Sequence, residues 1–490
     1  MLLLGIDLGT SSIKVSVVDP RTQLSLCTVQ YPETETAIVS EQIGWAEQSP
    51  ELWWEHIQKA ILKANVSGFY NPSDIAAIGI AYQMHGLVLV DKDQKLLRNS
   101  IIWCDSRAVG IGDEALNAIG EHKCLSHLLN SPGNFTASKL AWVKQNEPEI
   151  FDKIDKVMLP GDFIAMKLTG DITTSISALS EGVFWDFKEN SISEDVMNVY
   201  GFNKTIIPLI KPVFAEHGHL GSKQAEVLKL RKGIPVTYKA GDQPNNALSL
   251  NVLKPGEVAA NGGTSGVIYG VSDQLTFDRE SRINSFAHVN YSSGEKRIGV
   301  LLCINGTGIM NRWTKDVMGT GISYDYMNAI AKEIQIGSAG LRIIPFGNGA
   351  ERMLNNRNIG AHFHHIDLNK HNSAHIFRAV QEGIAFAFRY GLDIMRGNGM
   401  NPAVIRAGKT NLFSSALFTE AFVNACGVPL ELYSNEGSIG AAIGAGIGLG
   451  ELTTENAFPN LKPLQVVEPS DLKEYEDVYR DWKTVLETYL

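Results

Sequence analysis

The sequence predicts an α/β protein built from two related halves. Its start reads as a strand over residues 2–6, a tight Gly-Thr-Ser turn over 9–12, and a second strand over 13–17 in which apolar and polar residues alternate. A similar hairpin spans 258–273, where residues 263–267 repeat the first turn at an offset of 254 residues. That offset is about half of the 490-residue chain, so the two hairpins predict a duplicated domain.

The remaining patterns alternate between strand and helix. Ser49-Pro50 is a helix start signal, and the apolar runs 75–80 and 86–90 read as buried strands. Apolar residues recur at helical spacing over 376–395, and 471–490 reads as a charged amphipathic helix that can cap either half. No proline- or serine-rich linker separates the halves, so we expect them to share an interface and a cleft.

The composition is that of a globular protein, with 44% apolar and 20% charged residues. The net charge of −10 disfavours binding to nucleic acid or to anionic membranes. The five cysteines are dispersed and predict reduced thiols. The start lacks the basic segment of a signal peptide, and the apolar stretch 437–450 is too short to span a bilayer. We therefore expect a cytoplasmic location; the sequence leaves a homodimer open.

The two Gly-Thr-Ser turns are candidates for binding phosphate. Glycine lets the backbone approach an anion closely, and hydroxyl and N–H groups can then point at it. Taken alone, such a turn is more often an ordinary hairpin, and the neighbouring Asp7 favours the phosphate interpretation. Asp7 directly precedes the first turn, and an acid beside a phosphate loop is favourable only with a cation between them. Asp7 is therefore a candidate to hold Mg²⁺ through water.

Asp242 follows a strand-like run over 234–238 and a glycine, which would place it at a strand end in a cleft. The local sequence also fits a second reading, in which Asp242 caps the helix that starts near Pro244. Local sequence alone favours the cap.

Polar residues interrupt a buried apolar run at Gln83-Met84-His85-Gly86, which suggests a turn that opens on a pocket. Such groups can read the hydroxyls of a sugar, although a lone histidine is more often structural. Trp103 and Asp105 are candidates for the same pocket, with the tryptophan face against the C–H surface of a sugar.

A histidine cluster lies in the second half. His362 and His364 would share one face of a strand, near three further histidines and an aspartate. A zinc site is conceivable, but neither a cysteine ligand nor a glutamate base stands at a recognised spacing, so a metal is the weaker interpretation.

Together these motifs resemble, in order along nearly the whole chain, the FGGY family of carbohydrate kinases. The residues that carry the resemblance are Gly5-Ile6-Asp7-Leu8-Gly9-Thr10 with Lys14, Gln83-Met84-His85-Gly86, Trp103 with Asp105 and Arg107, Lys139-Leu140-Ala141-Trp142, Gly241-Asp242-Gln243, and Gly262-Gly263-Thr264-Ser265-Gly266. Within the family, the Gln-Met-His-Gly tetrad is similar to that of the members that phosphorylate D-xylulose.

The resemblance implies two actin-like domains of the ribonuclease-H type, a sugar-binding one over 1–246 and a nucleotide-binding one over 247–490. It implies ATP and a small sugar as substrates and Mg²⁺ as cofactor, with Asp242 as the base that takes the proton of the sugar hydroxyl. This reverses the local preference for a helix cap. The residues implied to contact the sugar are Gln83, Met84, His85, Trp103, Asp242 and Gln243. Those implied to contact ATP are Gly9, Thr10, Ser11, Lys14, Gly263, Thr264, Gly306, Gly408 and Lys409, with Asp7 for the metal.

Three departures from the family pattern fall in the second half. Arg406-Ala407-Gly408-Lys409 stands where the family has three consecutive glycines, a loop at Gly349–Leu354 carries an insertion, and Gln381 replaces an apolar residue. They make the nucleotide contacts less certain than the sugar contacts. The alternatives left open are a kinase of ribulose, gluconate or glycerol, and an actin-like ATPase with no metabolic product.

Overall fold

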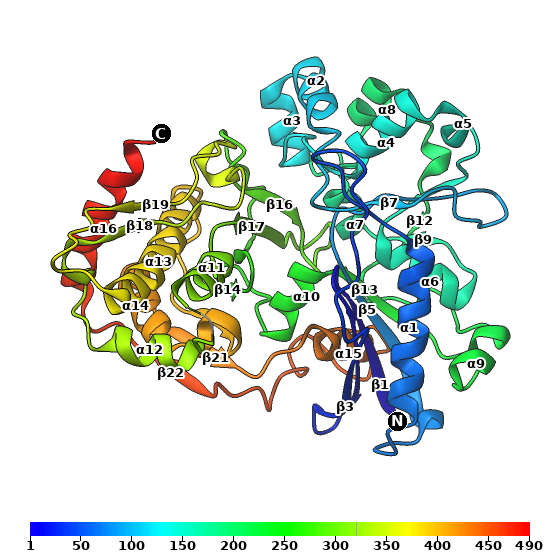
Figure 1. Ribbon diagram of the computed structural model, residues 1–490. Coiled ribbons are helices and arrows are strands. Elements are labelled where there is room, and N and C mark those ends of the chain that lie inside the picture. The colour runs from blue at the N-terminus through cyan, green and yellow to red at the C-terminus, as the bar shows by residue number, and fades with distance from the viewer. Residues whose placement is uncertain (320) are drawn as a thin grey trace.

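Each half of the chain folds around one mixed β-sheet in the computed structural model, which describes residues 1–319 and 321–490 (Figure 1). The first sheet has the order β13-β5-β1-β2-β3, with antiparallel β1–β2 and β2–β3 pairs and parallel β1–β5 and β5–β13 pairs. Its strands are β1 (Leu2–Leu8), β2 (Ile13–Asp19), β3 (Leu24–Tyr31), β5 (Ile75–Tyr82) and β13 (Val236–Gly241).

The second sheet repeats this arrangement. Its order is β16-β17-β15-β14-β20-β21-β22, and the five strands from β17 to β21 reproduce the order and the pair directions of β3-β2-β1-β5-β13. The strands are β14 (Val258–Gly262), β15 (Gly266–Ser272), β16 (Asn284–Ala287), β17 (Ile298–Ile304), β20 (Ile405–Gly408), β21 (Leu430–Tyr433) and β22 (Gln465–Val467). The duplication predicted from the two hairpins is thus confirmed.

Helices cover the first sheet on the side away from the second half. α1 (Pro50–Asn65) packs on β2 and β3, and the Ser49 side chain accepts a hydrogen bond from the Leu52 N–H, as its capping signal predicted. α6 (Pro160–Thr169) packs on β5 and β13. The other helices of this half are α2 (Val109–Ile119), α3 (Glu121–Leu128), α4 (Thr136–Asn146), α5 (Pro148–Phe151), α7 (Ile176–Glu181), α8 (Glu194–Tyr200) and α9 (Ser222–Leu228). Its short strands are β4 (Glu47–Gln48), β6 (Val88–Val90), β7 (Ser100–Ile101), β8 (Lys156–Met158), β9 (Thr173–Thr174), β10 (Trp185–Asp186), β11 (Ser191–Ile192) and β12 (Leu209–Ile210).

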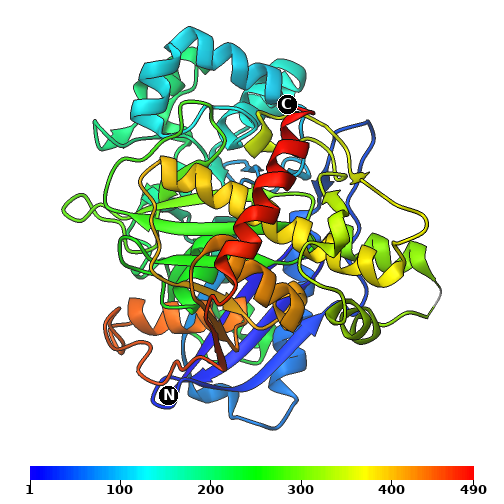
Figure 2. The same ribbon diagram turned by 90° about the vertical axis from the view of Figure 1, so that its left-hand side faces the viewer.

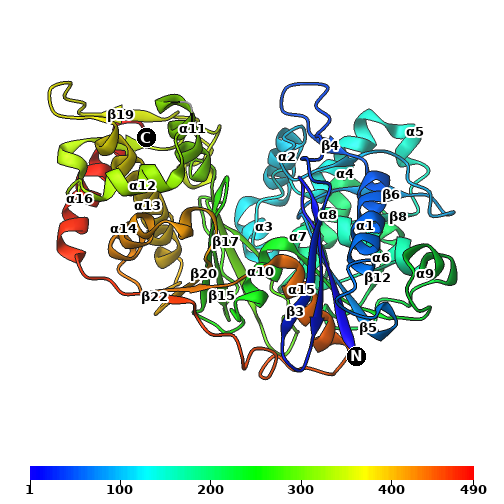
Figure 3. The same cartoon turned by 60° about the horizontal axis from the view of Figure 1, so that its bottom comes forward.

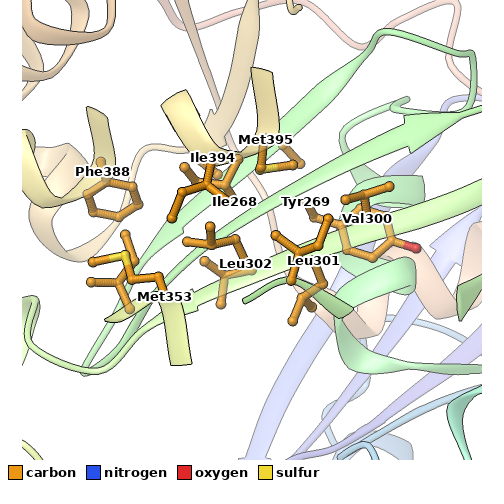
Figure 4. Packing of buried hydrophobic residues seen from close by; sticks show 14 of the residues in the cluster. Ile268, Tyr269, Val300, Leu301, Leu302, Met353, Phe388, Ile394 and Met395 are labelled. Atoms are coloured by element: carbon orange, nitrogen blue, oxygen red, sulfur yellow. The ribbon is translucent and has the colours of Figure 1, made fainter. Parts of the chain in front are cut away.

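In the second half, α13 (Ser373–Gly397) is the central helix. Figure 4 shows Phe388, Ile394 and Met395 of α13 packed against Ile268 and Leu302 of the sheet. The C-terminal helix α16 (Leu472–Glu487) crosses α13 and packs on α14 (Ala416–Cys426), so it caps the second half (Figure 2). The half also contains α11 (Gly308–Met318), α12 (Tyr324–Lys332), β18 (Arg342–Ile344) and β19 (His362–His364).

The two halves meet through a pair of helices that each follow the last parallel strand of a half. α10 (Asp242–Ser249) follows β13, and α15 (Gly437–Gly448) follows β21. α15 belongs to the second half by sequence, yet it packs on β1, β2, β5 and β13 of the first sheet and on α10 (Figure 3). Its glycines make this close approach possible, because a Cβ at Gly444 would lie 2.6 Å from the Tyr238 ring.

The glycine-rich apolar stretch at 437–450 is therefore a buried helix between the halves. Within the part of the chain that the structure describes, no helix is both long and apolar enough to cross a membrane.

Candidate active site

Asp242 lies where β13 ends and α10 begins, at the carboxyl edge of the first sheet. The helix-cap reading is wrong in its detail. Gly241 occupies the N-cap position, Asp242 is the first helical residue, and no side chain makes a capping hydrogen bond there. The half-buried carboxyl of Asp242 is therefore not used to cap α10.

The electrostatics of this carboxyl suit a general base. Burial, followed by the charge of nearby Asp7, raises the pKa of Asp242 to about 7, against hydrogen bonds from Gln243 that lower it. A base with a pKa near the working pH combines adequate basicity with a sizeable ionised fraction. The Gln243 side chain lies beside it, and its Oε1 atom is buried without a hydrogen-bond partner among the described residues.

Asp7 lies at the end of β1, against the first residue of α15. A Cβ built on Gly437 would lie 2.2 Å from the Asp7 Oδ2 atom, so a larger residue there would displace the Asp7 carboxyl. Burial raises the pKa of Asp7 to about 6, Lys14 lowers it and Glu436 raises it. Lys14 itself pairs with Glu436 at 2.7 Å. Asp7 offers carboxylate oxygens, the type of ligand that a hard divalent cation prefers.

The first Gly-Thr-Ser turn is fixed by hydrogen bonds centred on Thr10. The Thr10 hydroxyl donates to Gln83 Oε1 and accepts from Trp103 Nε1, both at 3.0 Å, while the Thr10 carbonyl accepts from Gln48 Nε2 at 2.8 Å. Gln83 is 1% exposed and also donates to Gln48, so its amide is committed to this network. Trp103 is 45% exposed.

The tetrad turns sharply at His85, whose φ of 61° is unusual for a residue other than glycine. Two buried side chains hold this turn. Glu181 Oε1 accepts the His85 backbone N–H at 2.6 Å, and Lys139 Nζ donates to the His85 carbonyl at 3.0 Å. Burial lowers the pKa of His85 to about 3, with Lys139 contributing, so the imidazole is neutral and can both donate and accept.

Glu181 also links the tetrad to the end of β13. Its Oε2 atom accepts from the Tyr82 hydroxyl at 3.4 Å and would lie 3.0 Å from a Cβ on Gly241. Met84 packs against the same glycine, with its Cγ atom 2.7 Å from that Cβ position. The tetrad, Glu181 and Asp242 therefore form one continuous surface.

The second half completes this surface. Phe286 of β16 contacts the His85 ring with centroids 5.4 Å apart, and both rings contact Phe135. Arg352, from the loop with the insertion, lies over the Phe135 ring at 5.8 Å and donates to Asn284. Sequence-distant groups from both halves thus enclose the tetrad.

A cavity of about 440 Å³ lies beside the second Gly-Thr-Ser turn. It is lined by Gly262, Gly263, Thr264, Gly308, Ile309, Asn311, Arg312, Tyr324, Asp325, Asn328, Asn411, Leu412, Ser414 and Ser415. The N-terminus of α11 approaches this turn closely, because the Ile309 N–H donates to the Thr264 carbonyl at 3.0 Å. Thr264 is exposed beside this helix start, where the positive end of the helix dipole suits a phosphate, and the cavity volume suits a nucleoside.

Of the five nucleotide contacts predicted in the second half, Gly263 and Thr264 line this cavity, and Gly306, Gly408 and Lys409 do not. The Gly306 N–H donates to Glu351 Oε1 at 2.9 Å and is therefore committed to a protein carboxyl, in contrast to the phosphate role implied for it. Gly408 and Lys409 lie at the end of β20, a few residues before the cavity-lining segment 411–415.

The histidine cluster has a structural explanation. His362 stacks on Tyr489 with ring centroids 4.1 Å apart, and His364 Nε2 hydrogen-bonds the Tyr489 hydroxyl at 2.7 Å. Among the described residues no group of three or more histidine, cysteine or acidic side chains could hold a metal ion. These histidines anchor the end of the chain.

Sequence reasoning missed Glu181, Phe286, Asn328 and Ser415. Glu181 and Phe286 lie in segments with no motif, and only tertiary packing brings them to the tetrad. Asn328 and Ser415 are also far apart in sequence. One signal pointed toward them, the polar Gln381 within an apolar helix, because a buried amide needs partners.

Two duplicated lobes, a cavity beside the Gly-Thr-Ser turn of one and a carboxyl beside the polar turn of the other are the arrangement of a two-lobed phosphotransferase. The chain matches the N-terminal domain of the FGGY family of carbohydrate kinases over residues 2–249. The chain belongs to this family, and membership of a kinase family implies the use of ATP.

Individual relatives agree with this assignment. The chain is 30% identical over 496 residues to a xylulose kinase of Staphylococcus epidermidis, covering 99% of this chain and 96% of the relative. Crystal structures of a xylulose kinase from Rhodospirillum rubrum (TM-score 0.88, 23% identity, covering 100% and 99% of the two chains) and of a gluconate kinase from Lactobacillus acidophilus (TM-score 0.89, 21% identity, covering 99% and 98%) share the fold. The fold is therefore common to kinases of different sugars.

Proposed function

We propose that this protein transfers the γ-phosphoryl group of ATP to D-xylulose, giving D-xylulose 5-phosphate and ADP. The observation that carries the proposal is the position of Asp242, with its pKa raised to about 7, beside the Gln-Met-His-Gly tetrad. The sugar is inferred from that tetrad and from the xylulose kinase of S. epidermidis, which is similar over nearly the full length of the chain.

In this mechanism Asp242 takes the proton of the C5 hydroxyl as its oxygen attacks the γ-phosphorus. The bond from that phosphorus to the bridging oxygen breaks, and ADP leaves with the electron pair. Neutral His85 and Gln243 hold sugar hydroxyls, and Trp103 covers the sugar. Thr10, Thr264 and Lys14 hold phosphate oxygens, for which the Thr10 hydroxyl must release Gln83 and Lys14 must exchange its partner Glu436.

Asp7 would hold Mg²⁺ near the phosphates through water. When bound, the ion supplies positive charge that offsets the charge on the phosphate oxygens. The dependence on Mg²⁺, the cytoplasmic location and the homodimer remain predictions.

A panel of acceptors tests the sugar. ADP release is measured with D-xylulose, L-ribulose, gluconate and glycerol at fixed ATP. We expect the highest kcat/KM for D-xylulose. A clear preference for another acceptor would leave the kinase class intact and refute the sugar assignment.

The Asp242→Asn variant tests the base. Loss of a general base slows the chemical step by about a hundred- to ten-thousandfold, and the KM for the sugar should change little because the base acts mainly in the transition state. Asp93→Asn, an exposed loop substitution, is the control. Near-normal kcat in Asp242→Asn would contradict the mechanism.

A further inference from the structure

Gln381 is a buried amide in the middle of the apolar helix α13, and both ends of its side chain are hydrogen-bonded. It is 0% exposed. Its Nε2 atom donates to Asn328 Oδ1 at 2.8 Å, and its Oε1 atom accepts from the Ser415 hydroxyl at 2.8 Å. The two partners come from α12 and from the N-cap of α14, and both line the 440 Å³ cavity.

These contacts fix the orientation of the Asn328 amide. Its Oδ1 atom accepts from Gln381 and lies 3.1 Å from the Ser415 hydroxyl. Among the hydrogen bonds of the described residues, none involves the Asn328 Nδ2 atom. If the Asn328 amide alone were reversed, its NH₂ group would face the Nε2 donor of Gln381 and both donors would lose their partner. If both amides were reversed, two NH₂ groups would face the Ser415 hydroxyl, which already accepts from the Phe418 N–H and would lose both of its own acceptors. The amide is therefore locked with its oxygen toward Gln381 and its NH₂ group available to the cavity.

We propose that Gln381 is a positioning residue for nucleotide binding: it holds Asn328 so that the Asn328 NH₂ group donates a hydrogen bond to a ring nitrogen of the adenine base. This inference rests on the proposed function, since it takes the cavity as the ATP site. Adenine carries acceptor nitrogens at N1, N3 and N7, so a fixed donor has a matching partner on the base.

The first test separates binding from chemistry. Gln381→Leu removes the lock with little change in volume, and Gln381→Met serves as a second variant if the first folds poorly. We expect the KM for ATP and the Kd for ADP, measured by calorimetry without sugar, to rise about three- to tenfold, the range for loss of one hydrogen bond. The KM for the sugar should stay unchanged and kcat should stay within about twofold. Gln274→Leu, an exposed substitution, is the control.

The second test identifies the contact. The 1-deaza, 3-deaza and 7-deaza analogues of ADP each lack one acceptor nitrogen. The unmodified protein should bind one of them about three- to tenfold more weakly than ADP. Gln381→Leu and Asn328→Ala should bind that analogue and ADP with equal affinity.

The outcomes are distinguishable. If all three analogues bind the unmodified protein as tightly as ADP does, or if Gln381→Leu and Gln381→Met bind ADP normally, the inference is overturned while the proposed function stands. If the unmodified protein binds no adenine nucleotide, both the proposed function and this inference are refuted.

Discussion

Asp7 and Asp242 are two carboxyls whose pKa values are both raised, to about 6 and about 7, where β1 and β13 end. In the unfolded chain an aspartate has a pKa of about 3.9. The folded state therefore binds more protons than the unfolded state as pH rises from about 4 to 7, so the two groups lower stability across that window. An active site can hold such unfavourable charge because function requires it.

The Asp242→Asn variant should consequently be more stable than the unmodified protein at pH 8. The amide removes both the buried charge and its repulsion with Asp7. We expect a Tm higher by a few degrees, since about 1 kcal/mol shifts the Tm of a domain this size by roughly 2–4 °C. Thermal unfolding at pH 8 and pH 4 without ligands measures it. The gain should disappear at pH 4, and Asp93→Asn should show no gain at either pH; a lower Tm for Asp242→Asn at pH 8 would refute this account.

Substitutions of Glu181 test whether this buried carboxyl, which accepts the His85 N–H, acts in its neutral form. Burial raises the pKa of Glu181 well above its usual value, which favours the protonated form. Glu181→Gln, a close match to that form, should keep kcat/KM for the sugar within about threefold, whereas Glu181→Ala should lower it by about tenfold or more because the buried His85 N–H loses its acceptor. Steady-state kinetics measures both. Equal losses in the two variants would mean that a charged carboxylate is required.

At the level of elements, the packing of α15 depends on the absence of side chains. A Cβ at Gly444 would overlap the buried Tyr238 ring at 2.6 Å. In a helix with free space around it, replacing glycine by alanine stabilises the fold by about 1 kcal/mol. A loss of stability on replacing Gly444 would therefore come from the steric conflict with Tyr238.

Gly444→Ala should therefore destabilise the protein by roughly 1–3 kcal/mol, the usual range for overpacking a core. Gly397→Ala is the matched control, because that glycine is helical and a Cβ there meets nothing within 4 Å. Denaturant unfolding of both variants gives the comparison. A stable Gly444→Ala protein would show that α15 can shift away from the first sheet.

The sequence predicted the elements whose signals are local. The two hairpins and the start of α1 follow from alternation, turn residues and the Ser49 cap, and all are confirmed. It did not predict that α15 packs on the sheet of the other half, because nothing local to a glycine-rich helix says which surface it covers. The sequence showed a polar Gln381 within an apolar helix. It could not identify the hydrogen-bond partners of that amide, because they are distant in sequence.

At the scale of the whole molecule, side chains of the first half hydrogen-bond the edge strand β16 of the second half, in addition to the packing of α15. Asn130 both accepts from the Ser285 N–H at 2.9 Å and donates to the Ser285 carbonyl at 2.6 Å, in the manner of a neighbouring strand. The Ser177 hydroxyl donates to the Ala287 carbonyl, and the Ala287 N–H donates to Ser180. The edge that an isolated domain would leave open is thus covered.

Asn130→Ala should weaken this interface. It leaves two buried backbone groups of Ser285 unpaired, at about 1–3 kcal/mol each. Differential scanning calorimetry should show a Tm lower by several degrees. Asn198→Ala, at an exposed position in α8, is the control. An unchanged Tm for Asn130→Ala would mean that the contact is replaced by water at no cost.

Because α15 covers the first sheet while its own sheet lies in the other half, neither half is a complete folding unit. A fragment ending near residue 250 would expose the face formed by Leu3, Ala77 and Tyr238, which α15 buries. The same fragment should regain a defined structure when a synthetic peptide spanning α15 is added. The two duplicated halves therefore depend on each other to fold, and a chain cut between them should reassemble into one enzyme.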